Sequence, residues 1–177
     1  MVARGKAKNT VQKGRVGVEV MEISFFSNDN HVNKEAIGAG IYRFMINKGN
    51  VTKALYIGES FSMLARCADH IYELKKDMSY FGLKEEYWED EELELIVDIY
   101  ESISVDGLSS SDRDILLREK ELNAIKKEKP LAQLETSDRL RKDRVEHVQK
   151  YLDSLNTIKI AYLKTIQPED RKDIKPA

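Results

Sequence analysis

The sequence has little of what marks several protein classes. One cysteine in 177 residues cannot form an internal disulfide, which excludes a disulfide-stapled secreted scaffold. No apolar run approaches the roughly 20 residues of a membrane span, and the N-terminus lacks the apolar core of a signal peptide. We also find no internal repeat and no low-complexity block. We therefore expect a soluble cytoplasmic protein with no membrane partner.

Acidic and basic side chains are almost balanced overall, but they are unevenly distributed. The 29 basic and 31 acidic residues give a net charge of −2, which taken alone argues against a nucleic-acid partner. Residues 1–15 contain five basic side chains and no acidic one, and we interpret them as a flexible basic tail. Residues 85–94 contain seven acidic side chains and no basic one, which is typical of a solvated loop. The other residues are at +5 (−2 minus −7), so the negative net charge comes from this one run.

Apolar residues make up 41% of the chain, which is enough for a core, and their spacing predicts an α+β domain. Alternating or β-rich apolar segments predict strands over residues 16–26, 40–46, 53–57 and 93–99. The sequence Asn47-Lys48-Gly49-Asn50 is typical of a turn, so the second and third strands are predicted to form a β-hairpin.

Three helices are predicted from capping residues followed by apolar stripes. The first begins at Ser60 or Ser62 and runs to about Lys76, and the second follows the serine cluster at 109–112 and ends before Pro130. The third begins at residues 136–138. We expect its apolar stripe to be buried in a dimer arm; the less favoured alternative is that the helix docks in a groove of a partner. The expected architecture is a central, mainly antiparallel sheet flanked by helices, with an added N-terminal strand and C-terminal helix.

Two tyrosines occupy matching places in the predicted hairpin. One strand reads Gly40-Ile41-Tyr42 and the other reads Tyr56-Ile57-Gly58. Side chains on adjacent antiparallel strands can lie side by side, so we expect both phenol groups on one face of the sheet. Taken alone, either tyrosine also fits an ordinary position in a sheet.

The helix after the hairpin carries Arg66 and, one turn later, His70. On a helical wheel both lie roughly 150° from the apolar stripe that contains Leu64, Ala68 and Ile71. We therefore expect Arg66 and His70 to face a substrate rather than the core, although a solvated helix face is the alternative.

The next helix places Glu121 on its apolar stripe, between Leu117 and Ile125. A carboxylate at such a position is costly unless it is paired or binds a metal ion. Arg118 is one candidate for the pairing. Glu119 points about 160° away from Glu121 and is expected to be solvated.

Together these residues resemble the GIY-YIG nuclease superfamily over about residues 38–133. The shared order is the two tyrosine triplets, then an arginine and a histidine on the next helix, then a glutamate on a later helix. A chain with this resemblance is expected to have a nuclease domain at 16–135, preceded by the basic tail and followed by a helical extension at 136–177. Gln133 stands where the family often has an asparagine, and its amide can make similar hydrogen bonds.

The resemblance implies a metal-dependent endonuclease that hydrolyses DNA to leave 5′-phosphate and 3′-hydroxyl ends. It makes Glu121 the ligand of Mg²⁺, for which Mn²⁺ can substitute, and Arg66 the clamp on the phosphate. It makes Tyr42 the general base and Tyr56 a group that positions the phosphate or water. His70 is then a hydrogen-bond partner or a competing base.

A restriction-type or phage-type enzyme that binds DNA, with a homodimer as one route to two-strand cleavage, is the favoured function. The alternatives are a catalytically silent nucleic-acid-binding module of the same fold, or a homing or repair nuclease. A silent module would be expected to have lost Arg66 or Glu121, and this chain has both.

Overall fold

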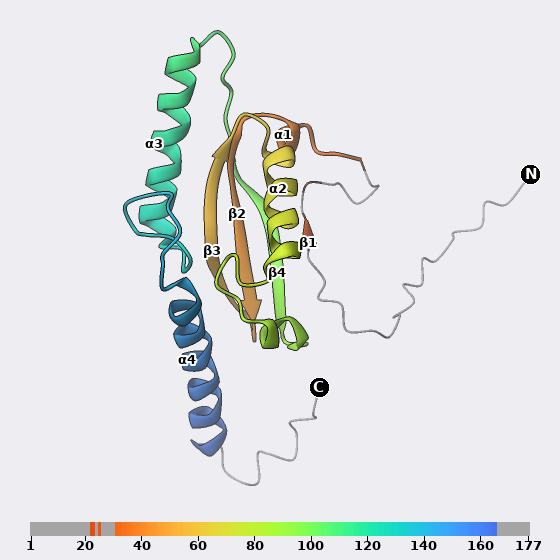
Figure 1. Cartoon of the computed structure of the whole chain (residues 1–177), viewed down its shortest axis with the longest axis vertical. Helices are drawn as coiled ribbons and strands as arrows, with labels where there is room; N and C mark the ends of the chain where they lie inside the picture. Colours follow the sequence, from red (N-terminus) through yellow and green to blue (C-terminus); the bar gives the residue numbers. More distant parts are fainter. Residues whose placement is uncertain (1–21, 24, 26–30, 166–177) are drawn as a thin grey trace, which may run out of the picture.

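The computed structural model describes residues 22–23, 25 and 31–165. Their strands form one sheet in the order β1-β4-β2-β3, in which β1 is parallel to β4 and the other neighbours are antiparallel. Helices flank the sheet, so the expected α+β class is confirmed (Figure 1). The elements in chain order are β1 (Glu22–Ile23), α1 (Lys34–Ile37), β2 (Gly40–Lys48), β3 (Val51–Ser60), α2 (Met63–Lys76), the 3₁₀ helix η1 (Glu85–Glu89), β4 (Leu93–Ser102), α3 (Ser110–Glu128) and α4 (Arg144–Thr165).

The predicted hairpin is formed by β2 and β3, which are longer than the sequence suggested. Gly49 and Asn50 make the turn with φ angles of 57° and 68°. Gly and Asn tolerate positive φ better than other residues, and hairpin turns of this kind require it. Opposite Phe44 and Met45 the register of β3 passes from Tyr56 to Ala54, so one residue of β3 is bulged.

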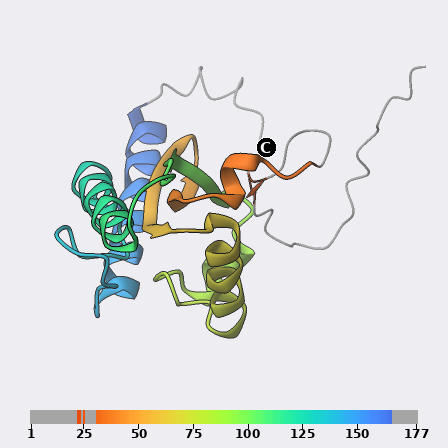
Figure 2. The ribbon, with the colours of Figure 1, turned by 90° about the horizontal axis from the view of Figure 1, so that it is seen from above.

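The sheet carries a different cluster of apolar side chains on each face. The larger cluster includes Tyr42, Phe44 and Tyr56 together with buried residues of α2. The smaller one joins Ile41 and Ile57 of the hairpin to Ala124 and Ile125 of α3. Seen from above, α2 and α3 accordingly lie on different sides of the hairpin (Figure 2).

The buried stripe of α2 differs from the predicted one. It consists of Met63, Cys67, His70 and Leu74, whereas Ala68 is exposed. The prediction that His70 faces away from the core is therefore wrong. Burial of its imidazole is compensated because both ring nitrogens lie within hydrogen-bond distance of tyrosine hydroxyls.

Helix α3 begins and ends as predicted. The Ser109 hydroxyl accepts a hydrogen bond from the backbone N–H of Asp112 at 3.2 Å, which caps the first turn. The helix ends at Glu128, and Lys129 follows in the left-handed region with φ of 48° before Pro130. This is a common way for a helix to end ahead of a proline.

The third predicted helix begins at Arg144, and the prediction that it begins at 136–138 is wrong. The backbone N–H groups of Leu131 and Ala132 instead donate to the carbonyls of Ala54 and Leu55 on β3, both at 2.9 Å. The residues after them turn back, so that Gln133 forms an isolated bridge with Leu140. This segment covers the outer edge of β3, which would otherwise expose unpaired backbone groups.

The apolar stripe of α4 is buried within the chain in its first half. Val148 and Leu152 are fully buried members of the larger cluster. Gly82, with φ of 88°, lets the helix approach closely, because a Cβ there would lie 2.7 Å from the carbonyl oxygen of Arg144. These side chains are therefore not available for the predicted dimer arm.

Several predictions concern residues at the ends of the chain. The basic tail at 1–15 and the segment after Thr165 lie outside the described residues. Of the strand predicted over 16–26, Glu22 and Ile23 pair with Ile96 and Val97 of β4. Among the described helices, none combines the length and the apolar character that crossing a bilayer would require.

Candidate active site

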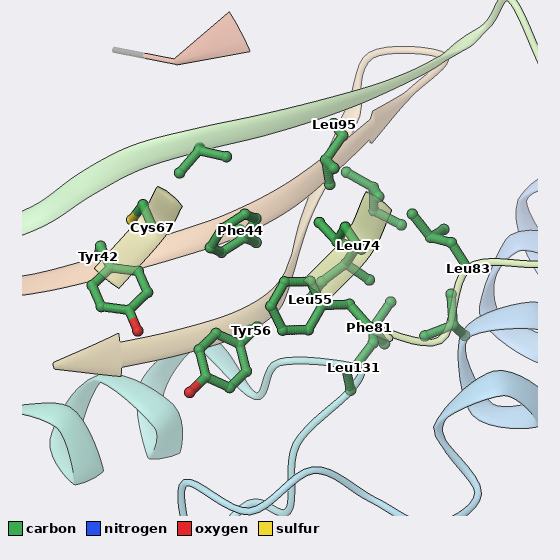
Figure 3. Close-up of a cluster of buried hydrophobic side chains, with 14 of the residues drawn as sticks. Tyr42, Phe44, Leu55, Tyr56, Cys67, Leu74, Phe81, Leu83, Leu95 and Leu131 are labelled. Atoms are coloured by element: carbon green, nitrogen blue, oxygen red, sulfur yellow. The ribbon is translucent and has the colours of Figure 1, made fainter. Parts of the chain in front are cut away.

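The two tyrosines of the hairpin lie on one face of the sheet, as predicted. Across β2 and β3, Tyr42 is opposite Gly58 and Tyr56 is opposite Phe44, so the tyrosines are diagonal neighbours. Their ring centroids are 6.3 Å apart. Both hydroxyls point to the same side of the cluster, towards the teal ribbon of α3 (Figure 3).

The glycines of the two triplets leave room for neighbouring groups. A Cβ at Gly58 would overlap the hydroxyl of Tyr42 and lie 2.6 Å from its Cζ. A Cβ at Gly40 would overlap the carbonyl oxygen of Glu101 and lie 2.8 Å from Sδ of Met63. Gly58 therefore lets the Tyr42 phenol lie against β3, and Gly40 lets α2 begin close to the sheet.

His70 connects the tyrosine pair to a third tyrosine. Its Nε2 is 2.8 Å from the hydroxyl of Tyr42, and its Nδ1 is 3.3 Å from the hydroxyl of Tyr80. Burial, with Arg66 as a second cause, lowers the pKa of His70 to about 4, so the imidazole is neutral at pH 7. One ring nitrogen then donates to a tyrosine oxygen while the other accepts from the second hydroxyl.

Burial favours the protonated form of both phenols. Burial raises the pKa of Tyr42 and of Tyr56 well above the ordinary value of about 10. Arg66 lowers both pKa values, but its effect is smaller than that of burial.

Arg66 lies at the solvent-facing rim of this cluster. Half of its side chain is exposed, and its nearest carboxylate is that of Asp69 at 3.8 Å. A guanidinium in this position is both close enough to affect the tyrosines and accessible to a phosphate group from solvent. The structure thus separates two residues that the sequence placed together, with Arg66 outside and His70 inside.

Glu121 is buried on α3, with 3% of its side chain exposed, and is paired with Arg118. The distance from Nη1 of Arg118 to Oε2 of Glu121 is 2.7 Å. Burial raises the pKa of Glu121 to about 7 even though Arg118 lowers it. The charge of Glu121 in turn raises the pKa of Tyr56, so the two groups lie within electrostatic reach of each other. Glu119 is exposed, as expected.

Glu121 is the only predicted metal ligand, and its surroundings would suit a loosely held Mg²⁺ ion only. In the part of the chain that the structure describes, no group of three or more His, Cys, Asp or Glu side chains could hold a metal ion. Mg²⁺ commonly binds through one or two carboxylates, with water and substrate phosphate oxygens completing its octahedron. A single buried carboxylate would suit that mode and would not suit a permanently bound structural ion.

Gln133 has a role that its sequence position did not reveal. Its Oε1 accepts from the backbone N–H of Ile57 and its Nε2 donates to the carbonyl of Ile57, both at 2.7 Å. Because Ile57 lies between Tyr56 and Gly58, this buried amide fixes the strand at the tyrosine triplet. The capacity of an amide to make both bonds was the available signal.

Two further residues of the site were not predicted. Tyr80, from the segment after α2, contacts His70 as described above. Glu59 directly follows the second triplet, and burial, with Asp114 as a second cause, raises its pKa. Arg118 and Arg66 both lower that pKa, so Glu59 lies within electrostatic reach of both arginines.

The acidic run is far from the tyrosines. Lys48 donates to Asp90 at 2.6 Å, and Asn47 donates to Glu94 at 2.8 Å. Lys48 is six positions beyond Tyr42 on β2, which corresponds to about 20 Å along a strand. The run is thus at the opposite end of the sheet from Tyr42, and part of it forms η1 rather than the predicted loop (Figure 1).

Comparisons of the chain with protein-family models, with curated proteins and with solved structures find no match. The fold and the site therefore define its class. It is a small α+β domain with two buried tyrosines and a buried histidine on one face of its sheet, a half-exposed arginine on the helix that carries the histidine, and a buried glutamate on α3.

Proposed function

We propose that this chain is a metal-dependent DNA endonuclease resembling the GIY-YIG enzymes. The observation that carries the proposal is the convergence of Tyr42, Tyr56 and His70, with Arg66 at the rim and Glu121 close to Tyr56. Hydrolysis of a phosphodiester needs a base for water, positive charge for the phosphate and stabilisation of the leaving 3′ oxygen. Each requirement has a candidate among these five side chains.

Arg66 binds the non-bridging oxygens of the scissile phosphate in this proposal. A guanidinium matches the geometry of a phosphate and stays charged at every relevant pH. Tyr42, once it has lost its own proton to solvent in the bound state, takes the proton from the attacking water as the phenolate, and Tyr56 orients the water or the phosphate. Because burial keeps Tyr42 protonated in the free protein, the bound state must lower its pKa before it can act as a base.

His70 supports this step through its hydrogen bond to Tyr42. A neutral imidazole can accept the phenol hydrogen bond at Nε2 while its Nδ1–H faces Tyr80. Glu121 would hold the cation. When bound, Mg²⁺ supplies positive charge to the phosphate and to the leaving oxygen. The products are a 5′-phosphate and a 3′-hydroxyl.

The test is plasmid cleavage in the presence and absence of Mg²⁺. We expect cleavage by the natural protein only with the ion, and a loss of about 100-fold or more for Arg66→Ala and Glu121→Ala. Glu119→Ala is the matched control, since it removes an exposed carboxylate from the same helix and should leave cleavage unchanged.

Two outcomes would contradict the proposal. The absence of ion-dependent cleavage for several DNA sequences and for RNA would overturn the enzyme function. Binding of DNA without cleavage would favour the catalytically silent module. Full activity of Glu121→Ala would remove only the assignment of the metal ligand.

A further inference from the structure

Arg118 bridges two carboxylates at the candidate metal site. Its Nη1 is 2.7 Å from Oε2 of Glu121 and 2.8 Å from Oδ2 of Asp138. Its Nη2 donates to Oδ1 of Asp138 at 3.0 Å. The guanidinium therefore grips Asp138 with both nitrogens and shares one of them with Glu121. This asymmetry means that Arg118 can release Glu121 and keep its two-pronged pair with Asp138.

The two carboxylates differ in their surroundings. The side chain of Glu121 is 3% exposed, whereas those of Arg118 and Asp138 are 44% and 41% exposed. Arg118 thus reaches in from the surface to meet a buried acid. A buried carboxylate needs a positive partner, and in this structure Arg118 supplies it. A divalent cation bound at the same carboxylate would supply that charge instead, and its repulsion would drive the guanidinium away.

Asp138 is held where it can receive Arg118. The amide of Gln133 donates to the backbone carbonyl of Asp138 at 3.2 Å while it also grips Ile57. The N–H of Leu134 donates to the carbonyl of Arg139 at 3.0 Å, which closes the turn that contains Asp138. The acceptor for Arg118 is therefore fixed by backbone contacts that do not involve Glu121.

We propose that Arg118 forms an ion pair with Glu121 in the ion-free protein and that an incoming divalent cation displaces it, while the guanidinium keeps its ion pair with Asp138. Arg118 is in this sense a positioning residue that competes with the metal ion. The inference rests on the proposed function, because it takes Glu121 to be the ligand. It adds a counter-ion exchange that keeps the buried carboxylate paired at every stage.

The test is calorimetric titration of the full chain with Mg²⁺ alone, without DNA. The titration is run at about pH 9, above the pKa of about 7 at Glu121, so that protons compete little for the carboxylate. We expect Arg118→Met to bind Mg²⁺ about fivefold more tightly, because the variant has lost the ion pair that competes with the metal ion for Glu121. The effect is modest because Arg118 is partly exposed. Arg118→Lys, which keeps the charge, should return most of the way to the natural affinity.

Two further variants separate this effect from overall charge. Lys120→Met removes one positive charge beside Glu121 but breaks only the exposed pair with Glu101, so its affinity should stay within about twofold. Asp138→Asn should weaken Mg²⁺ binding when Arg118 is present and have little effect in the Arg118→Met background. That difference is the coupling between Asp138 and Arg118 measured by a double-mutant cycle.

The outcomes distinguish this inference from the proposed function. If Arg118→Met binds Mg²⁺ no more tightly than the natural protein, while Glu121→Gln binds none, the exchange is wrong and Glu121 stays the ligand. If Glu121→Gln binds Mg²⁺ as the natural protein does, the ligand assignment fails, and the exchange fails with it. Circular dichroism of each variant confirms that it is folded.

Discussion

Replacing Gly58 with alanine tests whether the second triplet exists to seat the Tyr42 phenol. Gly58 is opposite Tyr42 in the hairpin. A methyl group at Gly58 would overlap the Tyr42 hydroxyl, lie 2.6 Å from Cζ and reach 3.0 Å from Cε1 of Tyr56. Tyr42 cannot move aside easily, since it is 1% exposed and its ring contacts Phe44 and His70.

The expected cost has two parts and one small offset. Overpacking a core by one methyl group costs roughly 1–3 kcal/mol. Displacing the Tyr42 hydroxyl from His70 leaves buried polar atoms without their hydrogen bond, at roughly 1–3 kcal/mol more. Alanine restricts the unfolded chain and returns roughly 0.4–1 kcal/mol. We therefore expect Gly58→Ala to lower the free energy of unfolding by about 2–5 kcal/mol, measured by urea denaturation.

Gly38→Ala is the matched control. A Cβ there would meet only the carbonyl oxygen of Glu35, at an ordinary distance of 3.8 Å, so the change should be close to neutral. Removing the Tyr42 hydroxyl should also reduce the cost of the Gly58 change, so we expect a smaller loss in a Tyr42→Phe background. Equal stability of the Gly58→Ala and Gly38→Ala proteins would refute the packing argument.

Four more expectations concern buried polar and titratable groups. Folding lowers the pKa of His70 from 6.5 to about 4, so the folded state holds the neutral imidazole. The free energy of unfolding should therefore be highest above pH 6.5 and should fall by about 3 kcal/mol as the pH falls towards 4. Folding raises the pKa of Glu121 from 4.5 to about 7, so this residue makes the protein less stable as the pH rises through that window. Glu121→Gln removes this effect and leaves that of His70, so the urea midpoint of the variant should rise more steeply between pH 4.5 and 6.5 than that of the natural protein. Gln133→Leu should cost about 2–4 kcal/mol in urea denaturation, because it orphans the N–H and carbonyl of Ile57; a cost below about 0.5 kcal/mol would contradict this. Cys67, buried with a pKa raised to about 12, should resist iodoacetamide at pH 8 until urea unfolds the chain, and rapid labelling of the native protein would contradict its burial.

The hairpin could be predicted because its information is local. Alternation along each strand and the Gly49-Asn50 turn fix which tyrosines share a face, and no distant residue is needed. The pairing of Glu121 with Arg118 could be anticipated for the same reason, since residues three apart on a helix are neighbours.

The errors arose where distant partners decide the outcome. A helical wheel considers only residues of the same helix, and it assigned the polar His70 to the exposed face. The hydrogen bonds of its two ring nitrogens to Tyr42 and Tyr80 come from other elements of the fold. Residues 136–138 look like a helix start because their side chains can cap. In the structure the Asp138 carboxylate instead pairs with Arg118, twenty positions earlier in the chain, and the helix begins at Arg144. Tertiary contacts thus override local propensity at both places.

A chain of polar contacts connects the tyrosine strand to the glutamate helix. Gln133 grips Ile57 beside Tyr56 and also holds the backbone of Asp138, whose side chain holds Arg118, which pairs with Glu121. The faces of the sheet alone would not fix this geometry, because Tyr56 belongs to the cluster under α2 whereas α3 packs on the other cluster. The segment at 131–141 crosses the edge of β3 between them. It therefore sets how far the carboxylate lies from the phenols, and the Gln133 amide holds it to the strand through two hydrogen bonds to Ile57.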